Sequence, residues 1–196
     1  MFEDALANDL YCFTTKCFKT ANPNTKYYGN WHLQLISEYL AAATRGEINR
    51  LIINMPPRSM KSLSVSVAWP AWLLGQDPAR RIIVASYSQH LSLKHSMDCR
   101  LVMNSEWYKK IFPTLEFARG QNEKAKFVTT QRGFRLATSL DGSVTGDGGN
   151  FLIVDDPTKP SHIHSQTTRQ HTIDWFEQTF SSRADDKKNS VFVVVM

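Results

Sequence analysis

The chain contains 196 residues, of which 42% are hydrophobic, 11% aromatic and 21% charged. This ordinary composition excludes a disordered, collagen-like or low-complexity protein. No run of 18 apolar residues exists to form a membrane-spanning helix, and the acidic N-terminus differs from the basic start of a signal peptide. Three cysteines without paired ligand spacing indicate reduced thiols rather than a disulfide framework or a zinc site. We therefore expect a cytoplasmic protein that does not associate with a membrane.

The net charge of +5 is unevenly distributed along the chain. Residues 80–135 hold eleven basic and four acidic side chains, a net charge of +7, so the remainder sums to −2. Such a segment is typical of a protein that binds a polyanion, because neutralising phosphates releases their counterions. A basic face that is only solvated would give the same pattern. The charge favours a nucleic-acid partner without deciding between these interpretations.

Hydrophobic periodicity and turn residues predict alternating helices and strands. The expected elements, in chain order, are a lead-in helix and turn over 1–30, a helix from 31 to Gly46, a strand over 50–55, a helix over 61–74, a strand over 81–85, a helix over 89–103, a hairpin of 127–128 with 134–137, a glycine-rich loop over 139–149, a strand over 151–154, a helix over 165–183 and a strand over 191–196. Pro70 is expected to kink its helix. Strands that alternate with helices indicate an α/β fold, with a mostly parallel sheet covered by helices on both faces.

The segment between the first predicted strand and the next helix has the layout of a nucleotide phosphate loop. It reads Met55-Pro56-Pro57-Arg58-Ser59-Met60-Lys61-Ser62, against the general pattern G-x-x-x-x-G-K-[ST]. In such loops backbone N–H groups face the phosphates, the lysine neutralises the β and γ oxygens, and the serine hydroxyl binds magnesium. Both glycine positions hold methionine here, although the backbone before the lysine can adopt conformations that are costly for residues with a side chain. An ordinary helix start could also read Lys-Ser.

Two adjacent carboxylates follow the apolar strand over 151–154. Side by side at a buried strand tip they are costly unless they meet a cation or water, which favours a magnesium–nucleotide site. We expect Asp155 to hold Mg²⁺, mostly through water, and Asp156 to orient or deprotonate the attacking water. An Asp-Asp-Pro turn that caps a helix is the alternative. Ser86-Tyr87-Ser88 end the strand over 81–85 and are expected to face the same crevice, with an ordinary polar loop as the alternative.

Together these motifs resemble the large terminase subunit of tailed bacteriophages and prophages, the motor that packages DNA into capsids. The likeness covers nearly the whole chain from Trp31, and the pairing of Pro-Pro-Arg-x-x-Lys-Ser with Asp-Asp-Pro at this spacing is specific for these motors. It rests on Trp31-His32, the segment from Arg50 to Arg58, Lys61-Ser62, Ala85-Ser86-Tyr87-Ser88, Glu106-Trp107-Tyr108, Phe112-Pro113, Gly142-Ser143-Val144-Thr145-Gly146 and Ile153-Val154-Asp155-Asp156-Pro157.

The resemblance implies a P-loop NTPase of the additional-strand type that uses ATP and Mg²⁺. It assigns phosphate binding to the loop residues Pro57, Arg58, Ser59, Met60, Lys61 and Ser62. It further implies that Ser62 and Asp155 hold the metal, that Arg58 acts on the γ-phosphate beside the catalytic Asp156, and that Gln34 lies near the adenine. The family usually has glycine where Met60 stands. An arginine paired with a surface acid, and a glutamine that only packs or faces solvent, are the alternatives for Arg58 and Gln34.

The resemblance covers only the front part of the family's ATPase domain. We therefore expect residues 1–30 to be a lead-in and residues 31–196 to be a partial ATPase domain, in a fragment too short for a nuclease domain and unable to cut DNA. The implied partners are double-stranded DNA, the terminase small subunit and the portal protein of the procapsid. A homo-oligomer is implied for the full-length protein, in the host bacterial cytoplasm. A truncated, non-catalytic prophage remnant and a helicase-like P-loop ATPase of another branch are the alternatives.

Overall fold

The computed structural model describes the chain except residues 1, 141, 143–145, 160 and 162–163. Residues 143–145 of the glycine-rich motif therefore lie outside the described residues. The helices are α1 (Phe2–Asn8), α2 (Leu10–Ala21), α3 (Trp31–Thr44), the π-helix η1 (Leu63–Ala68), α4 (Trp69–Gln76), α5 (Gln89–Asn104), α6 (Glu106–Ile111), α7 (Gln166–Asp174), the π-helix η3 (Trp175–Phe180) and the short 3₁₀ helix η4 (Ser181–Arg183). The strands are β1 (Arg50–Ile53), β2 (Arg81–Ser86), β3 (Phe117–Asn122), β4 (Lys126–Thr129), β5 (Phe134–Ser139), β6 (Phe151–Asp155) and β7 (Val191–Val195).

The strands form one sheet in the order β1-β7-β6-β2-β5-β4-β3. The first five run parallel to one another. Strand β4 pairs antiparallel with β5, as the predicted hairpin requires, and β3 pairs antiparallel with β4. Strand β7 lies between β1, which leads into the phosphate loop, and β6, which carries the acidic pair. This inserted strand confirms the predicted α/β fold of the additional-strand type.

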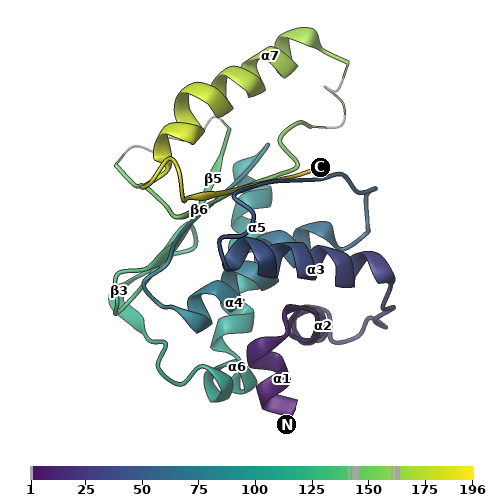
Figure 1. Ribbon diagram of the computed structural model, residues 1–196, viewed down its shortest axis with the longest axis vertical. Coiled ribbons are helices and arrows are strands. Elements are labelled where there is room, and N and C mark those ends of the chain that lie inside the picture. Colours follow the sequence, from purple (N-terminus) through teal and green to yellow (C-terminus); the bar gives the residue numbers. More distant parts are fainter. Residues whose placement is uncertain (1, 141, 143–145, 160, 162–163) are drawn as a thin grey trace.

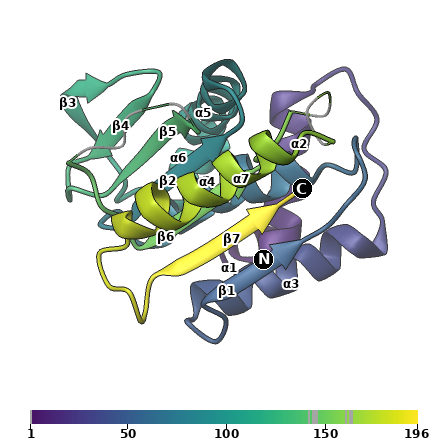
Figure 2. The ribbon, with the colours of Figure 1, turned by 90° about the horizontal axis from the view of Figure 1, so that it is seen from above.

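Helices cover both faces of the sheet, as predicted. Helices α1 to α6 lie on one face, and α7 with η3 lies on the other (Figures 1 and 2). Two apolar clusters fill the layers: Val84, Ile153 and Val193 face the first group, and Ile83, Leu152 and Phe192 face the second. This alternation along β2, β6 and β7 is the signature of strands buried on both sides. No helix in the described part of the chain is long and apolar enough to cross a membrane.

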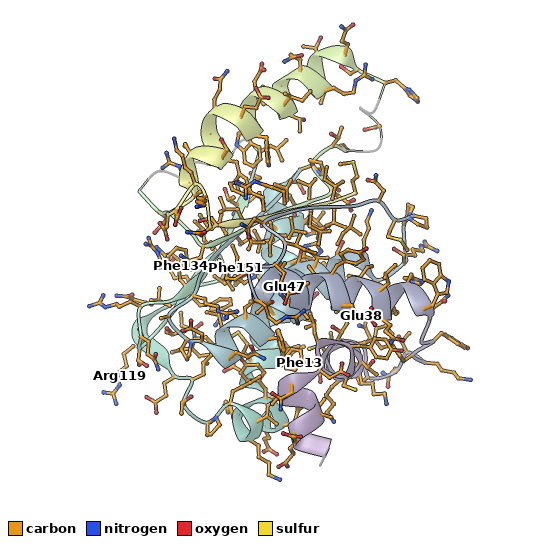
Figure 3. The ribbon with its side chains drawn as sticks, viewed as in Figure 1. Phe13, Glu38, Glu47, Arg119, Phe134 and Phe151 are labelled. Carbon is orange, nitrogen blue, oxygen red and sulfur yellow. The ribbon has the colours of Figure 1, made fainter. Side chains whose placement is uncertain are left out.

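The first thirty residues form two helices rather than one lead-in helix, and both contact the rest of the molecule. Phe13 of α2 is fully buried, and its ring lies 5.4 Å from that of Trp107 and 6.1 Å from those of Tyr108 and Phe112 (Figure 3). Leu10 and Cys17 belong to the same core cluster. The segment thus contributes to the core of the α/β fold, while its separation at residue 30 stays a prediction.

The helix that follows the phosphate loop contains the π-helix η1 immediately before Pro70. Proline has no N–H to donate to the carbonyl four residues earlier, here that of Ser66. The Arg135 guanidinium donates to this carbonyl instead, through Nη2 at 3.1 Å. The distortion predicted at Pro70 is therefore a π-helical segment, and it places Ser62 and Ser66 beside strand β6.

Candidate functional site

The carboxyl ends of the parallel strands surround a cavity of about 820 Å³. This is the edge at which α/β sheets bind ligands. The residues that line the cavity come from the phosphate loop, from the segments after β2, β6 and β7, and from α5 and α7: Met55, Pro57, Arg58, Met60, Lys61, Ser62, Leu63, Tyr87, Leu91, Asp156, Pro157, Thr158, Arg169 and Met196. The structure therefore brings together most of the predicted site residues.

The phosphate loop contains two residues in the left-handed region, Arg58 with φ 64° and Met60 with φ 61°. Met60 is the position at which glycine is expected, and its backbone has the conformation that a glycine would adopt freely. A residue with a side chain costs about 1–2 kcal/mol there. Backbone nests that include left-handed residues bind anions in other proteins, so the conformation of this loop is compatible with an anionic ligand.

Lys61, the predicted phosphate-binding lysine, and Asp156, the predicted general base, form an ion pair with Nζ and Oδ1 2.7 Å apart. Lys61 is only 8% exposed, and its Nζ also donates to the Met55 carbonyl at 3.4 Å. The backbone of Asp156 is fixed between two strands, because its N–H donates to the Val195 carbonyl and its carbonyl accepts from the Tyr87 N–H. The ammonium group and the carboxylate thus lie at the cavity wall, where a bound phosphate would compete for Lys61.

Asp155, the predicted metal ligand, is fully buried directly beneath this pair. Its Oδ1 accepts from the Ser62 hydroxyl at 3.0 Å and its Oδ2 from the Ser66 hydroxyl at 2.7 Å. Burial raises the pKa of Asp155 to about 6, opposed by these hydrogen bonds. The Nδ1 atom of His95 lies 3.3 Å from Oδ2, and burial, reinforced by the charge of Arg135, lowers the pKa of His95 to about 3.

The residues present fit a magnesium–nucleotide complex better than a metal site built from protein ligands alone. Ser62 and Asp155, which are hydrogen-bonded to each other, offer the hard oxygen ligands that Mg²⁺ prefers. Among the described residues, no three His, Cys, Asp or Glu side chains form a group that could hold a metal. In proteins Mg²⁺ is commonly held by one or two protein oxygens together with substrate phosphates and water. The Ser62 hydroxyl and the Asp155 carboxylate could supply the protein oxygens of such a site.

Arg135 of β5 lies close to the site, in contact with Ser66, and was not predicted from the sequence. It is fully buried, donates to the Ser66 carbonyl, and has no hydrogen-bond partner for Nε or Nη1 within the described residues. Burial lowers its pKa. A lone charge in the apolar run Phe134-Arg135-Leu136-Ala137 was the available signal, since charged residues are rarely buried without a specific contact.

Three predicted binding residues do not line the cavity: the fully buried Asp155, Gln34 and Ser59. Gln34 is exposed on α3 and donates to the Glu38 carboxylate at 3.1 Å, so its assignment to adenine stays a prediction. Ser59 turns its carbonyl toward Nε2 of His32 at 3.2 Å. A second cavity of about 640 Å³ is lined by residues that include Asn22, which follows α2, and His95 of α5, and it shares Arg58, Met60, Ser62 and Leu63 with the first.

Comparisons with known proteins support the fold. No family model matches the sequence, and no curated protein matches it either. Among solved structures, the chain is similar to the crystal structure of the HK97 bacteriophage large terminase, with a TM-score of 0.55 and 11% sequence identity. The match covers 93% of this chain and 37% of the terminase chain. The chain therefore has a terminase-like fold and spans little more than a third of that protein's length.

Proposed function

We propose that this chain is the ATPase domain of a terminase-type DNA-packaging motor, which hydrolyses Mg-ATP to drive double-stranded DNA into a capsid. The observation that carries the proposal is the phosphate loop itself. Met60 adopts the left-handed conformation of the missing glycine immediately before Lys61, in a loop that faces a cavity shared with Asp156. Strained backbone conformations of this kind cluster at active sites and ligand-binding loops. The terminase-like fold, with the acidic strand β6 two places from β1, supports the same assignment.

Each residue has a distinct part in the proposed reaction. Loop N–H groups and Lys61 bind the phosphates, and Ser62 with Asp155 would hold Mg²⁺, which when bound neutralises charge on the phosphate oxygens. Asp156 orients the attacking water and accepts its proton. Arg58 lines the cavity and is positioned to stabilise charge that develops on the γ-phosphate.

Only some of the basic side chains of residues 80–135 are available for the DNA contact that we propose. Five of its eleven basic side chains form ion pairs, and Arg135 is buried. Arg119, Lys124 and Arg132 are exposed on the β3–β4–β5 meander, where Arg119 points away from the molecule (Figure 3). We propose that the exposed basic side chains of this meander contact the phosphates of double-stranded DNA. The small subunit, the portal protein, a homo-oligomeric full-length motor and the host cytoplasm belong to the same proposal.

ATP hydrolysis by the purified chain, with and without duplex DNA, tests the proposal. We expect Mg²⁺-dependent hydrolysis that is lost in Lys61→Ala and reduced about 100-fold or more in Asp156→Asn, because a positioned general base contributes about 10²–10⁴-fold. Lys109→Ala, at an exposed site on α6, is the matched control and should hydrolyse ATP like the native chain. Hydrolysis that survives Lys61→Ala would contradict the proposal.

A non-catalytic remnant is the second candidate, and the methionine at position 60, where the phosphate-loop pattern has glycine, is the observation that favours it. In that case the native chain would bind no Mg-ATP, whereas Met60→Gly, which removes the strain, would bind it. If both the native chain and Met60→Gly bind with similar affinity, the remnant is excluded.

A further inference from the structure

The left-handed conformations of Arg58 and Met60 need contacts that hold them, because each is unfavourable for a residue with a side chain. Some of these contacts come from the loop's own helix: the Ser64 N–H and hydroxyl both donate to the Met60 carbonyl, at 3.0 and 3.1 Å. Another comes from a different element, since Nε2 of His32 on α3 lies 3.2 Å from the Ser59 carbonyl. This carbonyl belongs to the peptide group that joins Ser59 to Met60.

His32 is held rigidly enough to fix that peptide. It is the second residue of α3, whose first turn is capped by Asn30, with the Trp31 N–H donating to the Asn30 side chain at 2.8 Å. Leu33 and Ile36 of the same helix are buried in the core. Because a carbonyl only accepts hydrogen bonds, Nε2 must carry the hydrogen in this contact.

We propose that His32 is a positioning residue for phosphate binding, which holds the Ser59–Met60 peptide in the orientation that the phosphate loop needs. In a trans peptide the C=O and N–H groups point in opposite directions. A hydrogen bond that directs the Ser59 carbonyl toward α3 therefore directs the Met60 N–H away from it. His32 in this way compensates for the absence of glycine at position 60. The link to phosphate rests on the proposed function, whereas the effect on the loop does not.

A mutant cycle on the ligand-free protein tests the effect on the loop. His32→Phe keeps an aromatic ring without a donor, and His32→Gln replaces Nε2 with an amide N–H of similar reach. We expect His32→Phe to lower the Tm by about 4 °C in the native background, but by less than about 2 °C with Met60→Gly, whose backbone needs no external support. His32→Gln should retain most of the native Tm. Equal losses in both backgrounds, or no loss, would overturn the inference.

Binding of a fluorescent ATP analogue with Mg²⁺ tests the effect on phosphate. His32→Phe should weaken binding about tenfold in the native chain and less than about threefold with Met60→Gly, while His32→Gln stays within about threefold of native. If the native chain binds and His32→Phe binds equally well, the inference fails while the proposed function survives. If no variant binds the analogue, the proposed function fails, and the ligand-free cycle still decides the role of His32 in the loop.

Discussion

His95 and Asp155 should make contributions of opposite sign to the pH dependence of the free energy of unfolding. In the folded protein the pKa of Asp155 is about 6 and that of His95 about 3, against ordinary values of 3.8 and 6.5. Between pH 4 and 6 the folded state therefore carries a proton on Asp155, whereas the unfolded chain carries it on His95. Both states hold one proton, so the pair contributes little net slope over this range.

Each member alone would give a slope of opposite sign. The lowered pKa of His95 contributes stability that is present above pH 6.5 and is lost as the pH falls toward 3. The raised pKa of Asp155 contributes stability that is present below pH 3.8 and is lost as the pH rises through 6. One pH unit within either window changes the free energy of unfolding by about 1.4 kcal/mol, so between pH 6 and 4.5 each group contributes about 2 kcal/mol.

Single substitutions should expose these slopes. Relative to the native chain, Asp155→Asn should lose about 2 kcal/mol of stability between pH 6 and 4.5, and His95→Gln should gain about 2 kcal/mol over the same interval. For a chain of this size each change corresponds to a Tm shift of about 4–8 °C. Thermal unfolding in magnesium-free buffer at both pH values provides the measurement.

The substitution His90→Gln, at an exposed site on the same helix α5, is the matched control and should follow the native pH profile. Carboxylates elsewhere affect all variants alike, so the comparison depends on differences between variants at each pH. Parallel profiles for Asp155→Asn, His95→Gln and the native chain would refute this account of the buried pair.

Two further predictions concern the stability of core variants, and a third concerns cleavage of DNA. Arg135→Met removes the guanidinium N–H that donates to the Ser66 carbonyl and should cost about 1–3 kcal/mol in urea unfolding; adding Pro70→Ala, which restores an N–H at i+4, should recover part of the loss, and no recovery would contradict the π-helix explanation. Gly133→Ala should cost more than about 2 kcal/mol, because a Cβ there would clash with the Pro78 carbonyl oxygen and lie 2.6 Å from that of Arg80; native stability would contradict the packing. Pure protein with Mg²⁺ should leave supercoiled plasmid intact; nicking that Asp155→Ala abolishes would contradict the prediction that this chain does not cut DNA.

Local sequence patterns were sufficient for the parallel part of the sheet. Apolar runs such as Ile82-Ile83-Val84 and Leu152-Ile153-Val154 are strands buried on both faces, so their burial does not depend on knowing their neighbours. Strand β3 was missed because Phe-Ala-Arg-Gly-Gln-Asn is polar and mostly exposed, and only pairing with β4 makes it a strand. The role of α2 was underestimated because its aromatic contacts come from α6, more than eighty residues away in the sequence.

Local sequence patterns likewise predicted some residues of the candidate site and missed others. Lys61, Ser62, Asp155 and Asp156 were identified because strand ends and residue spacing reveal them, and the structure places them together. His32, His95 and Arg135 come from separate elements and acquire their roles only through tertiary contacts. The expected backbone cost at Met60 followed from residue type alone, and its left-handed φ confirms that expectation.

Thermal unfolding with and without Mg-ATP, for the native chain and Lys61→Ala, tests the central claim most directly. Ligand at one hundred times its dissociation constant adds about 2.7 kcal/mol to the stability. We predict a rise in Tm of about 5–10 °C for the native chain, which disappears when Mg²⁺ is omitted or Lys61 is replaced. A cooperatively folded native chain whose Tm does not change with Mg-ATP would contradict the claim that this loop binds nucleotide.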